Sequence, residues 1–121
     1  MKRDVLLYLS DIIENMRDAE QFIGIRTFEA FRSDKMAVNA VLRSLEVIGE
    51  ATKNVPEDIR NRRPGVPWRN MARMRDRVIH IYFGVDYTRV WEAVKDVIPT
   101  VRPEIESLLK DLQSEENAKT P

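Results

Sequence analysis

Residues 74–83, "MRDRVIHIYF", contain the side chains best suited to acid–base chemistry. The single histidine of the chain, His80, has Arg75 five positions before it and Tyr82 two positions after it. An imidazole can give or take a proton at neutral pH, and an arginine can clamp a phosphate through two N–H groups. Together these residue types could form half of an active site.

An alternative explains the same residues without chemistry. In it, Asp76 holds His80 by an interaction within the helix. Arg75 pairs with an acidic residue of a neighbouring helix, and Tyr82 belongs to the core. The residue types and their spacing fit both interpretations.

Helix geometry separates the residues of this stretch into two faces. If residues 74–83 form one straight helix, Arg75 and Tyr82 lie about 20° apart on one face. Asp76 and His80, four residues apart, are neighbours on a second face. Arg75 and His80 diverge by about 140°. A site that uses both is therefore predicted to need a distorted helix or a second copy of the chain.

A cluster of basic residues surrounds this stretch. Between Arg60 and Arg77 seven arginines are opposed only by Asp76, a local excess of +6 in a chain of zero net charge. The cluster is either a solvated face with helix ion pairs or a local footprint for an anion or RNA. In the second case Arg69, Arg73 and Arg77 are the candidates for following an RNA backbone, with strongly salt-dependent binding.

The composition excludes several other kinds of site. The absence of cysteine excludes disulfides, a thiolate nucleophile and cysteine–zinc sites, and one histidine excludes histidine-rich metal clusters. No glycine-rich nucleotide loop and no carboxylate spacing typical of a magnesium site is present. We therefore expect no metal and no cofactor. The N-terminus resembles neither a signal peptide nor a membrane span, so we expect a cytoplasmic protein without a membrane partner.

Apolar residues recur at three- and four-residue steps along most of the 121 residues, which predicts helices. No strand alternation and no internal repeat is present. The pattern predicts one all-α domain, residues 1–112, built as an antiparallel bundle of four or five helices. The polar residues 113–121 are expected to form a disordered tail.

The expected helices have recognisable ends. Gly24 ends the first helix, and "GIRTFEAFRSD" is a connector. Ser33 or Asp34 caps the second helix, and Asp86 caps the one that begins with "YTRVWEAV". Prolines mark the remaining boundaries: Pro56 opens a short turn or helix, a long helix to about Phe83 starts near Pro67 or Trp68, and Pro99 marks a helix start or a kink.

The spacing of Arg75, His80 and Tyr82 resembles the Arg-x4-His-x-Tyr signature of the HepT-like branch of the HEPN superfamily. The resemblance extends to "RDVLLYLSDIIENM", "RSLEVIGEATK" and "VPWRNMARMRDRVIHIYFGVDYTRVWEAVKDVIP", in that order. It therefore covers about residues 3–112. Ile81 stands where many relatives have a small residue such as glycine, a departure that leaves the chemistry intact.

The resemblance implies a homodimeric helical bundle that acts as a metal-independent ribonuclease, the toxin of a type VII toxin–antitoxin pair. The implied antitoxin is a nucleotidyltransferase of the MntA type that silences the toxin by transferring AMP onto Tyr82. We expect a composite site at the dimer interface, with Arg75 and His80 from both copies and Asp76 orienting His80. Transfer RNA and messenger RNA both remain open as substrates.

Two other functions stay compatible with the sequence. One is a helical partner of a nucleotidyltransferase with no cutting activity of its own. The other is a structural dimer in which His80 is buried and hydrogen-bonded. A nuclease assay with a His80→Ala control distinguishes the ribonuclease from both.

Overall fold

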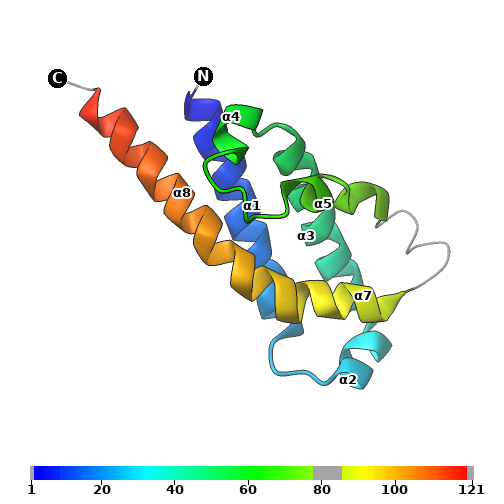
Figure 1. The fold of residues 1–121 in the computed structure, drawn as a ribbon. Helices are drawn as coiled ribbons and strands as arrows, with labels where there is room; N and C mark the ends of the chain where they lie inside the picture. Colours follow the sequence, from blue (N-terminus) through cyan, green and yellow to red (C-terminus); the bar gives the residue numbers. More distant parts are fainter. Residues whose placement is uncertain (1, 78–85, 120–121) are drawn as a thin grey trace.

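The computed structural model describes residues 2–77 and 86–119, and all secondary structure in these ranges is helical. Three long helices form the body of the molecule: α1 (Lys2–Ile23), α3 (Lys35–Lys53) and α8 (Ile98–Ala118). Helices α3 and α8 both run antiparallel to α1, so the two termini lie at the same end (Figure 1). The predicted all-α fold is confirmed for the described residues.

Five short elements connect the long helices: α2 (Phe28–Ser33), α4 (Glu57–Arg60), α5 (Trp68–Ala72), α7 (Tyr87–Glu92) and the π-helix η1 (Ala93–Val97). Helix α2 lies in the stretch that the sequence analysis interpreted as a connector. The long helix expected after Pro67 does begin at Trp68, but a turn at Arg73 separates α5 from the helical residues 74–77. Residues 78–85, the rest of that expected helix, lie outside the described residues.

The predicted helix ends are confirmed where local chemistry determines them. Gly24 follows α1 with a φ of 56°, a left-handed conformation that glycine adopts without strain. Asp34 caps α3, because its carboxylate accepts a hydrogen bond from the Ala37 amide at 3.1 Å. Asp86 caps α7 in the same way, through the Arg89 amide at 3.3 Å.

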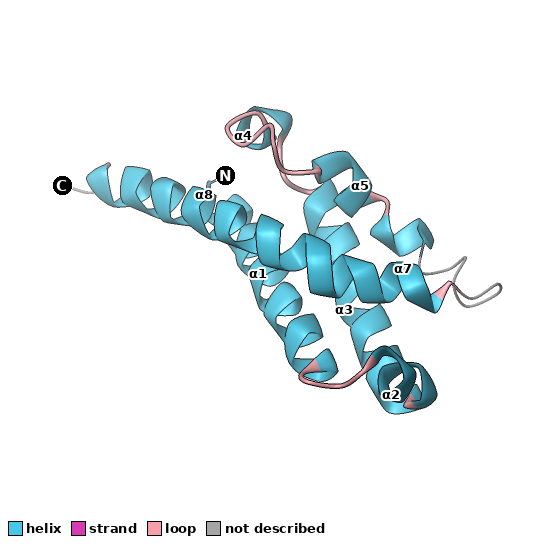
Figure 2. Cartoon of the chain, turned by 60° about the horizontal axis from the view of Figure 1, so that its bottom comes forward, coloured by secondary structure: helices cyan, strands magenta, loops and turns pink. Residues whose placement is uncertain are grey.

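Helices α7 and α8 follow one another as a single rod, with η1 between them (Figure 2). The amide of Ile98 donates to the carbonyl of Ala93, five residues earlier, which changes the hydrogen-bond register just before Pro99. Pro99, predicted as a helix start or a kink, therefore lies at the start of α8. Pro103 stands inside the same helix.

Helix α8 also extends further than expected. Residues 113–118 continue the helix, whereas the sequence analysis expected disorder from residue 113. One reason is a long-range contact: Arg62 donates two hydrogen bonds to the Glu115 carboxylate. These bonds raise the pKa of Arg62 above its usual value.

The core lies where α1, α3 and α8 meet. Its largest fully buried side chains include Leu9, Ile12, Met16, Val41, Ile48, Ile105, Leu108 and Leu112. Two arginines on the surface fix the pairing of α1 with α8: Arg17 bonds Glu106, and Arg102 bonds both Glu20 and Glu106. In the described part of the chain, no helix is long and apolar enough to cross a membrane.

Helix α3 approaches the segment after α5 unusually closely. A Cβ atom added at Gly49 would lie 2.8 Å from the backbone nitrogen of Arg75 and 3.3 Å from the carbonyl oxygen of Met71. Both neighbours are backbone atoms, which cannot turn aside as a side chain can. Glycine at position 49 therefore allows the backbone of residues 71–75 to lie directly on α3.

We expect Gly49→Ala to lower the free energy of unfolding by about 1–3 kcal/mol, because the added methyl group forces two packed backbones apart. Gly65→Ala is the matched control, since a Cβ at that position has no atom within 4 Å. Urea unfolding of both variants measures the difference. Equal midpoints for Gly49→Ala and wild type would show that the close approach does not exist in solution.

Candidate functional site

Arg75 lies in the helical turn formed by residues 74–77, directly after α5, and contacts of residues 68–75 fix the backbone of this segment. At its start, the indole N–H of buried Trp68 donates to the carbonyl oxygens of Arg60 at 3.1 Å and Arg63 at 3.0 Å. The buried Met71 and the contact with Gly49 fix it against α3. The position of Arg75 therefore follows from that of α3.

The side chain of Arg75 forms an ion pair with Glu50 of α3. Its Nη1 donates to Glu50 Oε1 at 2.9 Å, and the side chain is 48% exposed. Lys53 Nζ lies 3.6 Å from the same carboxylate oxygen, so the three groups carry a net charge of +1. This is the pairing with an acidic residue of a neighbouring helix that the alternative without chemistry predicted for Arg75, and that part of the alternative is confirmed. Among the described residues, no second acceptor binds the guanidinium, whose other N–H groups are of the type that can bind an anion.

The arginine cluster of the sequence has two parts with different roles. Its first part holds the chain after α4 in place. Arg60 donates to the carbonyl oxygens of Thr52 at 2.7 Å and Val55 at 3.0 Å, where α3 ends. Arg62 and Arg63 bind carboxylates of α8: Arg62 binds Glu115, and Arg63 binds Asp111 at 2.6 Å. Arg62 and Arg63 fit the interpretation of a charged face with ion pairs, whereas Arg60 binds backbone carbonyls.

The second part is a row of exposed arginines, Arg69, Arg73 and Arg77. The Arg73 amide donates to the carbonyl of Arg69, and the Arg77 amide to that of Arg73, at 3.3 and 3.1 Å. Successive members are therefore about one helical turn apart along this segment, roughly 6 Å in a regular helix. None of the three forms an ion pair with another residue in the described ranges. The structure thus brings together the three arginines predicted to bind RNA.

The remaining candidates are only partly described. Asp76 is exposed, and no other described residue forms an ion pair with it. His80 and Tyr82 lie outside the described residues. The shared face of Arg75 with Tyr82 and the contact of Asp76 with His80 therefore stay predictions.

Sequence reasoning missed the two residues of α3 that contact Arg75. Gly49 and Glu50 are consecutive in α3, and both stand in the stretch "RSLEVIGEATK". A glycine inside a helical pattern is the signal that could have found the first, because it often marks a close backbone approach. No comparable signal singles out Glu50 among the acidic residues of the chain.

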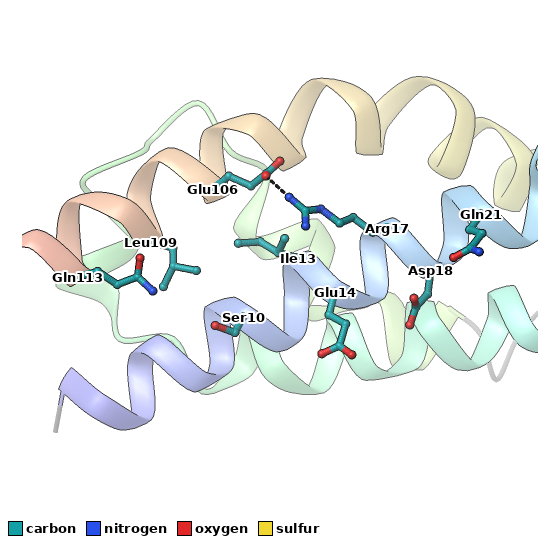
Figure 3. A pocket seen from close by; sticks show the side chains of 9 residues that line it. All are labelled: Ser10, Ile13, Glu14, Arg17, Asp18, Gln21, Glu106, Leu109 and Gln113. Atoms are coloured by element: carbon teal, nitrogen blue, oxygen red, sulfur yellow. Dashed lines mark hydrogen bonds and ion pairs between the residues drawn. The ribbon is translucent and has the colours of Figure 1, made fainter.

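Two grooves run along α1. The groove between α1 and α3, of about 290 Å³, is lined by Glu50 together with Tyr8, Asp11, Arg43, Glu46, Val47, Ala51 and Asn54. Its three carboxylates and one arginine make it unfavourable for a phosphate chain. The groove between α1 and α8, of about 520 Å³, is crossed by the ion pair of Arg17 with Glu106 (Figure 3). It lies away from α5, which packs on α3.

Neither groove offers a metal site. Within residues 2–77 and 86–119, no three histidine or acidic side chains are grouped so that they could hold a metal ion. The chemistry visible in the described residues is therefore that of arginines and their carboxylate partners.

Comparison of the sequence with known proteins shows the family to which this chain belongs. Residues 12–108 match the family described as "Ribonuclease HepT-like". A protein of Methanocaldococcus jannaschii named "Putative RNase" is 50% identical over 115 residues, 95% of each chain. A protein of Thermococcus cleftensis named "Probable ribonuclease HepT" is 48% identical over 110 residues, 91% of this chain and 100% of that one. No solved structure matched the chain. The chain belongs to the HepT-like ribonuclease family, as the resemblance predicted.

The two parts of the arginine cluster should differ in their effect on stability. We expect Arg60→Ala to lower the free energy of unfolding by about 1–3 kcal/mol, because two carbonyls at the end of α3 lose a charged donor. Arg69→Ala should change it by less than about 0.5 kcal/mol, as is usual for exposed positions. Urea unfolding of both variants provides the comparison. A larger loss for Arg69→Ala would contradict the division.

Proposed function

We propose that this chain is the toxin of a toxin–antitoxin system, an endoribonuclease that needs no metal. The observation that carries the proposal is the state of Arg75 in a HepT-like chain. One of its N–H groups binds Glu50, and about half of its side chain is exposed. The same segment carries three more exposed arginines that form no ion pair with other described residues. Such an arrangement suits a phosphate backbone better than a neutral ligand.

The proposed reaction is an internal attack within RNA. A base removes the proton of a ribose 2′-hydroxyl, and the 2′ oxygen forms a bond to phosphorus. The bond from phosphorus to the 5′ oxygen breaks, and an acid protonates that oxygen. Arg75 binds the non-bridging oxygens and stabilises their charge. The products are a 2′,3′-cyclic phosphate and a 5′-hydroxyl.

The two proton transfers explain why the proposed enzyme is a homodimer. Each chain has one histidine, His80, and an imidazole can act as base or as acid at neutral pH. A two-fold axis would supply one His80 for each transfer and an Arg75 from each copy. Asp76 is proposed to orient His80 and to stabilise its charged form.

Regulation is proposed to act through Tyr82. A nucleotidyltransferase antitoxin of the MntA type would transfer AMP onto the phenol oxygen. The resulting ester places a negative phosphodiester near Arg75 if both residues share a helix face. It would then occupy the phosphate site and repel RNA.

The proposal is tested first by incubating wild-type protein and His80→Ala with total RNA in the presence of EDTA. We expect wild type to cleave, and His80→Ala to be at least about 100-fold slower, as is typical for loss of a positioned acid or base. Mass spectrometry of a cleaved oligonucleotide should show a 2′,3′-cyclic phosphate. Products with 3′-hydroxyl ends would exclude this mechanism. No cleavage by a wild-type sample free of AMP would favour the non-catalytic binding partner.

Tyr82→Phe separates cleavage from regulation. Because the phenol oxygen has no proposed part in cleavage, we expect nuclease activity within about threefold of wild type, a change well below that of losing an acid or base. The variant should stay active after incubation with the antitoxin and ATP, whereas wild type should gain the mass of AMP and lose activity. Covalent transfer of AMP that still silences Tyr82→Phe would refute the role of Tyr82.

A further inference from the structure

We propose that Glu50 is a positioning residue for Arg75: its carboxylate holds the guanidinium so that the remaining N–H groups face a phosphate of the RNA. The inference rests on the proposed ribonuclease function and assigns a role to a residue outside the Arg-x4-His-x-Tyr signature. It starts from the 2.9 Å hydrogen bond between Arg75 Nη1 and Glu50 Oε1.

The ion pair of Arg75 with Glu50 differs from the ion pairs that Arg102 forms between and within the helices α1 and α8. Arg102 uses Nε and Nη1 to bind two carboxylates, each at 2.7 Å, and is 25% exposed. Its bond to Glu20 raises its pKa above the usual value, as expected for a cation committed to carboxylates. Arg75 is held at one N–H and is 48% exposed. Among the described residues, the Arg75 guanidinium is therefore oriented by one carboxylate, and its other N–H groups bind no acceptor there.

Backbone and side chain of Arg75 are fixed by the same turn of α3. Gly49 brings the backbone nitrogen of Arg75 against the helix, and Glu50, the next residue, binds the guanidinium. A long, flexible side chain is thus held at both of its ends. Such restriction benefits catalysis, because a group already in place needs no further ordering when substrate binds.

The charge of Glu50 carries a disadvantage for RNA binding. Its carboxylate repels a phosphate, and Lys53 Nζ, 3.6 Å from the same oxygen, offsets this repulsion. Exposed ion pairs contribute little to folding stability, so orientation is the larger effect to expect from this one. Loss of the carboxylate should therefore impair the reaction while leaving RNA binding equal or tighter.

The test compares kcat and KM for one RNA oligonucleotide among three variants of the full-length protein. We expect Glu50→Ala to lower kcat roughly 10- to 100-fold, the scale of a misplaced catalytic group, with KM unchanged or lower. Glu50→Gln keeps an oxygen acceptor and should lose less. If Glu50 only stabilised the fold, Glu50→Ala would instead lower the midpoint of urea unfolding. It would not lower kcat while leaving KM unchanged.

Glu46→Gln is the matched control. Glu46 lines the same α1–α3 groove one turn earlier in α3, and its carboxylate lies 4.0 Å from Arg43, its ion-pair partner. The substitution therefore removes an equal charge from the same groove without removing a partner of Arg75. We expect its kcat and KM to stay within about threefold of wild type, since a surface substitution of this kind is nearly neutral.

The outcomes separate this inference from the proposed function. If wild type cleaves RNA and Glu50→Ala matches it in kcat, Glu50 has no positioning role and the ribonuclease stands. If Glu46→Gln falls as far as Glu50→Ala, general charge in the groove is responsible and the inference is overturned. If unmodified wild type does not cleave RNA, both proposals fail together. Should Glu50→Ala not fold, Glu50→Gln decides, and a kcat equal to that of wild type overturns the inference.

Discussion

The candidate site depends on one backbone contact, that of Gly49 in α3 with residues 71–75. Helix α3 packs along α1 and is among the most buried elements of the described chain. A contact without an intervening side chain transmits the position of this helix to Arg75 with little freedom. Arg75, the proposed phosphate-binding residue, thereby has a backbone held by the core, although its own side chain is half exposed.

The arginine cluster shows how one residue type serves two purposes within 18 residues. Arg60 binds carbonyls at the end of α3, whereas Arg62 and Arg63 bind carboxylates of α8, which largely neutralise the charge of these two where they lie. Salt screens exposed charges beyond about 8–10 Å, so these paired arginines add little to the potential at Arg75. The attraction for an anion then comes mainly from Arg69, Arg73 and Arg77, which have no carboxylate partner among the described residues.

Features of the structure that depend on neighbouring residues could be predicted from the sequence, and long-range contacts could not. Asp34 and Asp86 cap helices because a carboxylate reaches an amide three residues later, a purely local matter. The ion-pair partner of Arg75 is 25 positions away, and the sequence does not show which of the 20 acidic residues it is. The contact of Arg62 with Glu115 near the end of α8 likewise joins residues far apart in sequence. For the candidate site, Arg75 and the row of arginines were named from the sequence, whereas the contacts of Gly49 and Glu50 with Arg75 required the fold.

The Glu50 carboxylate also bears on how two copies could meet. In the proposed dimer, an Arg75 from each chain approaches the two-fold axis, and like charges repel when no anion lies between them. Each guanidinium arrives with Glu50 and Lys53, so each cluster carries +1 rather than the +2 of its two cations. This reduces the repulsion in the empty dimer. A phosphate between the clusters would remove much of the remainder, which couples binding of the substrate to stability of the interface.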